Sequence, residues 1–287
     1  MYINFLRHKT IPYPSGSALE FRNNVLYVVG DDINYVLCLD NDWNEINRIV
    51  LFEFDGDRIP KPDKPDLECA TIIADVLYLM GSGSKSPQRD VAFIVDLFTG
   101  KIKKINTAAF YAIFRDRKLV QEMNIEGFSV CKDQLLFFNR ANTTQGNQLI
   151  ITDTKIIEKQ LPNKFKIIPI NIAPLENIPL GISGACYDAI QDRLFLTASA
   201  EDTSNAYDDG KIIGSVLAIV DNAYEQLTKP TLDIHPLIYL DKVHSAFTEQ
   251  KIESICITES KNNFYKCTLV ADNDDGKSQL FEIEILI

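Results

Sequence analysis

Short apolar runs recur along most of the chain, and turn-forming residues separate them at intervals of about ten positions. Residues 124–142 show the pattern most clearly, because two strand-like runs, 128–131 and 135–138, flank a polar turn. Such an arrangement is typical of a β-hairpin. Helical periodicity is scarce and is strongest at residues 107–119, within an insertion that we place at 107–122. The chain is therefore predicted to be all-β.

The hairpin recurs five times with one landmark, a serine or glutamate at the start of its first strand. We call this residue the anchor of its copy. In the first three copies the anchor lies nine positions before a leucine, and the last two copies have longer hairpins. Each interval between anchors can hold four short strands, which is typical of a β-propeller. The five anchors are Ser17, Glu68, Glu126, Ser183 and Glu253.

We predict a single domain over residues 1–287, folded as a five-bladed β-propeller. The last copy lacks a fourth strand, and the N-terminal strand would supply it and close the ring. Six blades are the alternative, if the 70-residue interval between Ser183 and Glu253 conceals a degenerate blade. A β-sandwich would not explain five hairpins of one pattern. The predicted blades cover residues 12–60, 66–106, 124–172, 181–240, and 251–287 together with 1–10.

Composition narrows the class of protein. Of the 287 residues, 46% are hydrophobic, and the net charge is −11. This content suits a globular core, and the negative charge argues against nucleic-acid binding, which requires a basic surface. No apolar run approaches the roughly 20 residues of a membrane span, and no signal peptide is visible. The six cysteines form no C-x-x-C pair, so we expect reduced thiols in a cytoplasmic protein.

The anchors suggest a metal site. In a propeller the first strand of each blade lines the central channel, so the five anchors should converge near its axis. Three glutamates there would repel one another, and a bound cation would remove that repulsion. Carboxylate and hydroxyl oxygens suit Ca²⁺, which takes 6–8 oxygen ligands, better than the tighter octahedron of Mg²⁺. Ser17, Glu68, Glu126, Ser183 and Glu253 are therefore candidate calcium ligands. The alternative is that the glutamates cap strands or pair with nearby arginines.

A second set of polar residues should lie above the anchors. The second strand of each blade ends on the face where the first strand begins, so the residues that follow these strands would form a polar mouth. Arginine and a metal there could bind phosphate or another small anion. Exposed polar loops without a ligand are the competing interpretation. The candidate ligand-binding residues are Ser82, Ser84, Arg89, Asn142, Glu201, Asp202 and Asp272.

The order Ser, Glu, Glu, Ser, Glu over five blades resembles the calcium-activated nucleotidases (apyrases), which are five-bladed propellers with a calcium ion in the tunnel. The local strings that carry the resemblance are Gly30-Asp31-Asp32, Glu126-Gly127 with Arg140-Ala141, and Ser183 with Ala200-Glu201-Asp202. The resemblance implies that the anchors bind calcium and that Asp31, Asp32 and Arg140 lie near the hydrolysed phosphate. The chain departs from that family where Ile33-Asn34-Tyr35 replaces Arg-Thr-Gly and where Asn139-Arg140 replaces a doubled arginine.

A group of uncharacterised bacterial propellers, similar to phytase-like and esterase-like propellers, shares further strings with this chain. These strings are GSGS at 81–84, NIEG at 124–127, NRAN at 139–142 and AEDT at 200–203. The group implies a fold and an ion site but no defined activity.

Two functions are compatible with these patterns. The first is a calcium-binding hydrolase of phosphate esters or anhydrides, in which Arg140 and Arg89 hold negative charge and Asp31 or Asp32 orients water. The second is a non-catalytic propeller whose mouth binds a small ligand or a protein while the ion is structural. The sequence contains no G-x-S-x-G, P-loop or G-x-G-x-x-G motif, so it leaves open whether the protein is an enzyme.

Overall fold

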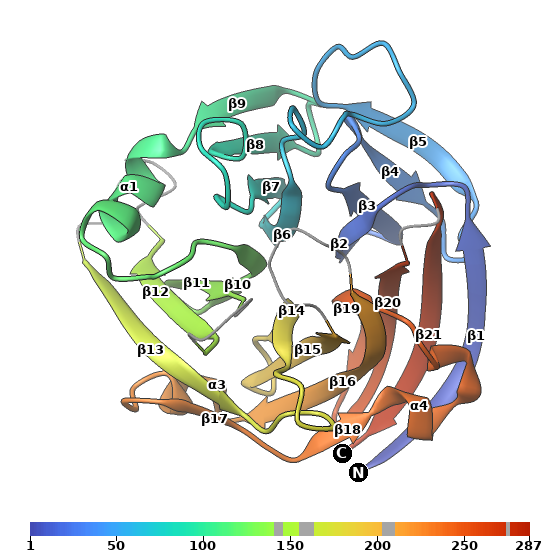
Figure 1. Cartoon of the computed structure of the whole chain (residues 1–287). Coiled ribbons are helices and arrows are strands. Elements are labelled where there is room, and N and C mark those ends of the chain that lie inside the picture. The colour runs from blue at the N-terminus through green and yellow to red at the C-terminus, as the bar shows by residue number, and fades with distance from the viewer. Residues whose placement is uncertain (141–145, 155–163, 203–209, 274–275) are drawn as a thin grey trace.

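The protein is a ring of five β-sheets around a central channel (Figure 1). The computed structural model describes residues 1–140, 146–154, 164–202, 210–273 and 276–287. Figure 1 looks along the channel, with the first strand of each blade nearest the centre. The predicted five-bladed propeller is confirmed.

The first two blades, and all strands of the third except the last, follow the chain in order. The first contains β2 (Gly16–Arg22), β3 (Val25–Gly30), β4 (Tyr35–Leu39) and β5 (Glu45–Val50). The second contains β6 (Leu67–Ile73), β7 (Val76–Gly81), β8 (Val91–Asp96) and β9 (Ile102–Asn106). The third contains β10 (Ile125–Cys131), β11 (Gln134–Asn139), β12 (Gln148–Asp153), β13 (Phe165–Ile172) and β17 (Leu232–Ile234).

The last two blades include the segments that close the ring. The fourth contains β14 (Gly181–Asp188), β15 (Arg193–Asp202), β16 (Lys211–Asp221) and β18 (Leu237–Tyr239). The fifth contains β19 (Ile252–Lys261), β20 (Phe264–Asp272), β21 (Ser278–Leu286) and β1 (Tyr2–Ile11). Among the described residues, the helical segments are α1 (Ala108–Asp116), α3 (Ala223–Gln226), α4 (Leu240–Val243) and η1 (Ser245–Phe247).

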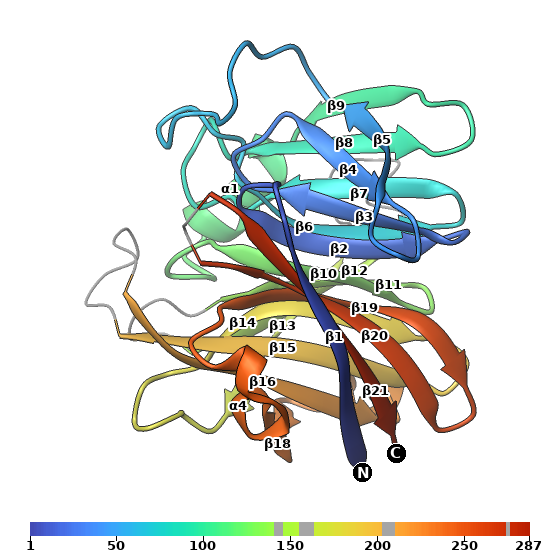
Figure 2. The ribbon, with the colours of Figure 1, turned by 90° about the vertical axis from the view of Figure 1, so that its right-hand side faces the viewer.

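The N-terminal strand closes the ring as predicted. β1 pairs antiparallel with β21, so the outermost strand of the fifth blade comes from the opposite end of the chain. Figure 2 shows β1 lying along β21, with the two termini near each other. The two ends of the chain therefore share one blade.

The described residues of the long interval between the fourth and fifth anchors form no sixth blade. Its segment β17 adds a fifth, parallel strand to the outer edge of β13 in the third blade. The chain then returns to the fourth blade, where β18 pairs with β16. The extra residues therefore cover the edges of two existing sheets, and the six-bladed alternative does not apply.

Every anchor lies at a β-bulge. In each blade the register between the first and second strands shifts by one residue at the anchor, for example from Leu67↔Gly81 to Cys69↔Met80 around Glu68. The same shift occurs at the other four anchors. A bulge leaves one residue without a partner opposite it and redirects that side chain. The repeated anchor is thus a repeated backbone feature.

The core is divided among the blade interfaces. Five clusters of buried apolar residues occur, and each joins two neighbouring blades. Between the second and third blades, α1 contributes the buried Phe110, Tyr111 and Phe114. Burying one such side chain stabilises the fold by roughly 1.5–3 kcal/mol.

All six cysteines are free thiols, and only Cys186 is partly exposed. No described helix is long and apolar enough to cross a membrane.

Candidate functional site

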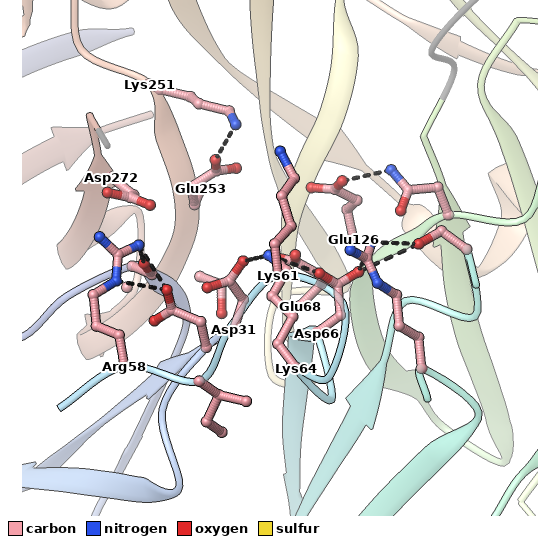
Figure 3. A pocket seen from close by; sticks show the side chains of 18 of the residues that line it. Asp31, Arg58, Lys61, Lys64, Asp66, Glu68, Glu126, Lys251, Glu253 and Asp272 are labelled. Atoms are coloured by element: carbon pink, nitrogen blue, oxygen red, sulfur yellow. Dashed lines mark hydrogen bonds and ion pairs between the residues drawn. The ribbon is translucent and has the colours of Figure 1, made fainter. Parts of the chain in front are cut away.

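A polar cavity of about 430 Å³ opens at the end of the channel where the anchors lie (Figure 3). Its walls come from the first, second, third and fifth blades, and none of the described residues of β14, β15, β16 or β18 lines it. Of the residues that the structure describes, eight acidic and five basic ones line the cavity. This acidic excess favours a ligand that carries positive charge.

Residues two positions before the anchors form a second polar layer. Ser15, Asp66, Asn124 and Lys251 occupy this position in four blades, and all four line the cavity. The amide of Asn124 donates a hydrogen bond of 2.7 Å to Glu126. The anchor repeat already marks these positions, so the same spacing could have identified them from the sequence.

One side of the cavity holds a compact carboxylate cluster. Oxygen atoms of Asp31, Asp66 and Glu68 all lie within 4.8 Å of one another, a spacing that could hold a metal ion. Lys64 pairs with Asp31, and its Nζ lies 2.8 Å from Asp66 Oδ1. The other oxygen of Asp66 accepts a hydrogen bond of 2.6 Å from Arg89. Figure 3 shows Asp31, Lys64, Asp66 and Glu68 meeting at one wall.

The residues of the cluster change one another's pKa values. Burial raises the pKa of Asp31 to about 6, although Lys64 opposes the shift. Burial and the neighbouring carboxylates of Asp66, Asp31 and Glu126 raise the pKa of Glu68 well above its usual value. Burial opposes the charge of Lys64, but attraction to Asp31 and Asp66 outweighs it and raises the pKa of the ammonium. Additional positive charge would therefore stabilise the carboxylates.

A second charged network includes Glu126, Lys251 and Glu253, which line the cavity, and Arg140 and Glu201, which do not. Arg140 is 2.5 Å from Glu201, 3.3 Å from Glu126 and 3.9 Å from Glu253, and its side chain is only 9% exposed. Lys251 lies 3.0 Å from Glu253 and 3.3 Å from Glu201. Two protein cations therefore compensate three carboxylates, two of which are anchors.

The two serine anchors link neighbouring blades. Ser17 donates a hydrogen bond of 2.5 Å to the carbonyl of Leu67, and Ser183 donates one of 2.6 Å to the carbonyl of Ile252. In both cases the acceptor is the residue just before the next anchor. Of the five predicted calcium ligands, only Glu68 belongs to the compact cluster. Glu126 and Glu253 belong to the second network, and Ser183 does not line the cavity.

The predicted catalytic and ligand-binding residues lie in several environments. Five of them line the cavity, namely Asp31, Asp32, Ser84, Arg89 and Asp272. Ser82 is buried behind the wall and donates its hydroxyl hydrogen to Asp66. Glu201 pairs with Arg140, and Asp202 is exposed at the end of β15. Asn142 lies outside the described residues.

Comparison with known proteins places the chain in a family. The profile of a family of unknown function, DUF6929, matches residues 12–285. The chain belongs to this family. Membership in DUF6929 identifies no activity. No curated protein matches the chain.

Two solved structures share the propeller fold of this DUF6929 protein. A glutaminyl cyclase from Myxococcus xanthus has a TM-score of 0.56 and 11% identity, covering 99% of this chain and 97% of that one. A glycosyl hydrolase from Bacteroides ovatus has a TM-score of 0.52 and 10% identity, covering 94% and 84% respectively. At such low identity the likeness shows the fold alone, although both neighbours are enzymes by name.

Sequence reasoning missed four cations of the DUF6929 cavity, Lys251 and three that lie on one connection. Arg58, Lys61 and Lys64 all lie on the connection between β5 and β6, which ends two residues before the anchor Glu68. Arg58 pairs with Asp32 at 2.6 Å. The available signal was compositional, since residues 58–64 read RIPKPDK, with three cations in seven positions.

Proposed function

We propose that this chain is a calcium-binding hydrolase of phosphate esters or anhydrides, with the cavity at the channel end as its active site. The observation that carries the proposal is the cluster of Asp31, Asp66 and Glu68, whose oxygens lie within 4.8 Å of one another at the wall of a polar cavity. The activity is the one that the resemblance to calcium-activated nucleotidases implies.

The residues present fit a hard divalent cation. All three groups are carboxylates, which Ca²⁺ prefers as ligands. Asp31 Oδ1 is buried and has no hydrogen-bond partner among the described residues. A buried carboxylate oxygen without a partner is costly, and a cation would satisfy it. In this proposal the ion lies on the side of the first two blades, and Glu68 is the ligand shared with the predicted ring.

The remaining wall suits a small anionic substrate. A volume of about 430 Å³ is in the range of small-molecule sites. When bound, calcium would neutralise charge on the phosphoryl oxygens. Arg89 and Arg58 would donate hydrogen bonds to the phosphate, and Arg58, whose side chain is 44% exposed, is held in place by Asp32 and Ser15. Asp32 would orient the attacking water through its Oδ1 atom, which has no hydrogen-bond partner among the described residues.

A specific observation favours a second candidate, a non-catalytic propeller that binds a small ligand in the same cavity. Lys64 already compensates Asp31 and Asp66, while Arg140 and Lys251 compensate the glutamates of the second network. The polar wall would then recognise a ligand without performing chemistry.

Phosphate release separates the two candidates. The full chain would be incubated with a panel of nucleotides and aryl phosphates, in calcium and in a chelator. The hydrolase proposal predicts release that requires calcium and is lost in Asp66→Asn. Asp42→Asn is the matched control, because the side chain of Asp42 is 85% exposed and should leave turnover unchanged. Absence of release across the panel would overturn the hydrolase, and equal release in chelator would overturn the role of calcium.

A further inference from the structure

Lys64 enters the cavity from the connection between β5 and β6. Its side chain is only 13% exposed, and its ammonium contacts carboxylate oxygens of both Asp31 and Asp66. Figure 3 shows Lys64 reaching the same wall as the two carboxylates. These two residues also belong to the cluster that could hold a metal ion. The lysine therefore occupies the place where the cluster concentrates negative charge.

The ammonium and a divalent cation cannot share this place. Calcium approaches its oxygen ligands to about 2.3–2.6 Å. The Nζ atom of Lys64 already lies 2.8 Å from Asp66 Oδ1 and contacts Asp31 Oδ2. An ion that contacted both of these oxygens would overlap the ammonium and would be repelled by its charge. Binding of the ion through these two oxygens requires that the ammonium move away.

The backbone around Lys64 is fixed, so that movement is confined to the side chain. The amide of Lys64 donates to the carbonyl of Pro60 at 3.1 Å. On either side, the amide of Ile59 donates to the backbone carbonyl of Asp32 at 2.7 Å, and the amide of Asp66 donates to the backbone carbonyl of Asp31 at 3.0 Å. The lysine stem has four rotatable carbons, so its ammonium can turn away while the loop stays in place.

We propose that Lys64 is a tethered competitor for the divalent cation. It neutralises Asp31 and Asp66 when no ion is bound, and the ion displaces its ammonium into the cavity. This inference rests on the proposed cation site. The displaced ammonium would remain within the cavity, where an anionic ligand could contact it. Ion binding thus changes Lys64 from an internal partner of two carboxylates into a group available to the ligand.

Removing the lysine charge should have opposite effects on stability and on ion affinity. Lys64→Met keeps the length of the side chain but removes the cation that pairs with both Asp31 and Asp66. In chelator this variant should therefore melt at a lower temperature than the wild type. Calcium should bind the variant at least tenfold more tightly, because no ammonium has to be displaced, and should raise its melting temperature more than that of the wild type.

The test is calorimetric titration of calcium into the full-length wild type and Lys64→Met, with melting temperatures in calcium and in chelator. Lys85→Met is the matched control, since it removes the same charge from an exposed residue between β7 and β8 and should bind calcium as the wild type does. Equal or weaker binding by Lys64→Met would overturn the competitor while the cation site stands. Absence of binding in every protein would overturn the cation site and the competitor together.

A second measurement uses the wild type and does not depend on folding of the variant. Acetylation of lysines by a water-soluble reagent would be mapped by mass spectrometry with and without calcium. The proposal predicts that saturating calcium accelerates modification of Lys64 several-fold and leaves Lys85 unchanged. A rate for Lys64 that calcium does not change, in protein that binds calcium, would show that the ion lies elsewhere and would overturn the competitor.

Discussion

Replacing Arg140 with glutamine should destabilise the fold by about 3–5 kcal/mol near neutral pH. Arg140 is buried and lies within 4 Å of Glu126, Glu201 and Glu253. Without it, Lys251 still compensates Glu201 and Glu253, but Glu126 loses the cation closest to it. The loss of folding stability is therefore expected at the lower end of this range, about 3 kcal/mol.

The destabilisation should grow as the pH rises. Burial raises the pKa of Glu253 to about 8, and Arg140 is one of the groups that oppose this shift. Burial opposes the charge of Glu201 as well, but Lys251 and Arg140 lower its pKa. Loss of Arg140 raises the pKa of both carboxyls in the folded state, so the folded variant binds more protons than the folded wild type at a given pH. Its stability must then fall relative to the wild type between pH 5 and pH 8.

Urea unfolding at pH 5 and pH 8 would measure this effect. Fluorescence of Trp43, which is the single tryptophan and is buried, would report unfolding. Arg48→Gln is the control, because Arg48 is 51% exposed and its pair with Glu45 should contribute at most about 1 kcal/mol. A loss below about 1 kcal/mol for Arg140→Gln at pH 8, or a larger loss at pH 5, would refute the reasoning. A stable variant that loses only turnover would instead support contact between Arg140 and the phosphate.

Three further substitutions or reactions test other parts of the site. Gly181→Ala should lower the free energy of unfolding by about 1–3 kcal/mol, because the added Cβ would lie 2.5 Å from Arg140 Nε. Unchanged stability in urea would mean that the guanidinium can move aside. Ser17→Ala should lower the free energy of unfolding by about 1 kcal/mol and change calcium affinity by no more than about twofold, because the Ser17 hydroxyl donates to a backbone carbonyl. A tenfold loss of calcium affinity in calorimetry would instead identify Ser17 as a ligand. Burial raises the pKa of all six thiols, so labelling of the native protein with a disulfide reagent at pH 8 should be slow. The reaction should be fastest at Cys186, which is partly exposed. Any thiol that reacts as fast in the native protein as in denaturant would contradict this expectation.

The repeat predicted the fold because it reflects the backbone. Each anchor lies at a bulge, and a bulge fixes both the spacing and the direction of one residue in every blade. Closure of the ring followed from counting strands. By contrast, the three-residue strand β17 joins β13 from about 60 positions away. Tertiary packing decides such a short parallel pairing, so no local sequence pattern predicted it.

The charge partners in the site could not be predicted in the same way. Lys64 lies in a connection outside the repeat, and its pairing with Asp31 depends on the path of that loop. Arg140 reaches Glu201 in the neighbouring blade because Gly181 has no side chain to block it. The repeat indicated which carboxylates approach the axis. It carried no information about which cations compensate them.

The position of a bound ion tests the central claim most directly. Crystals of the full chain grown or soaked with calcium, or with terbium as an anomalous scatterer, would locate the ion. The account predicts one ion about 2.3–2.6 Å from oxygens of Asp31, Asp66 and Glu68, with the ammonium of Lys64 moved away. An ion between Glu126 and Glu253, or no ion at saturating calcium, would contradict it.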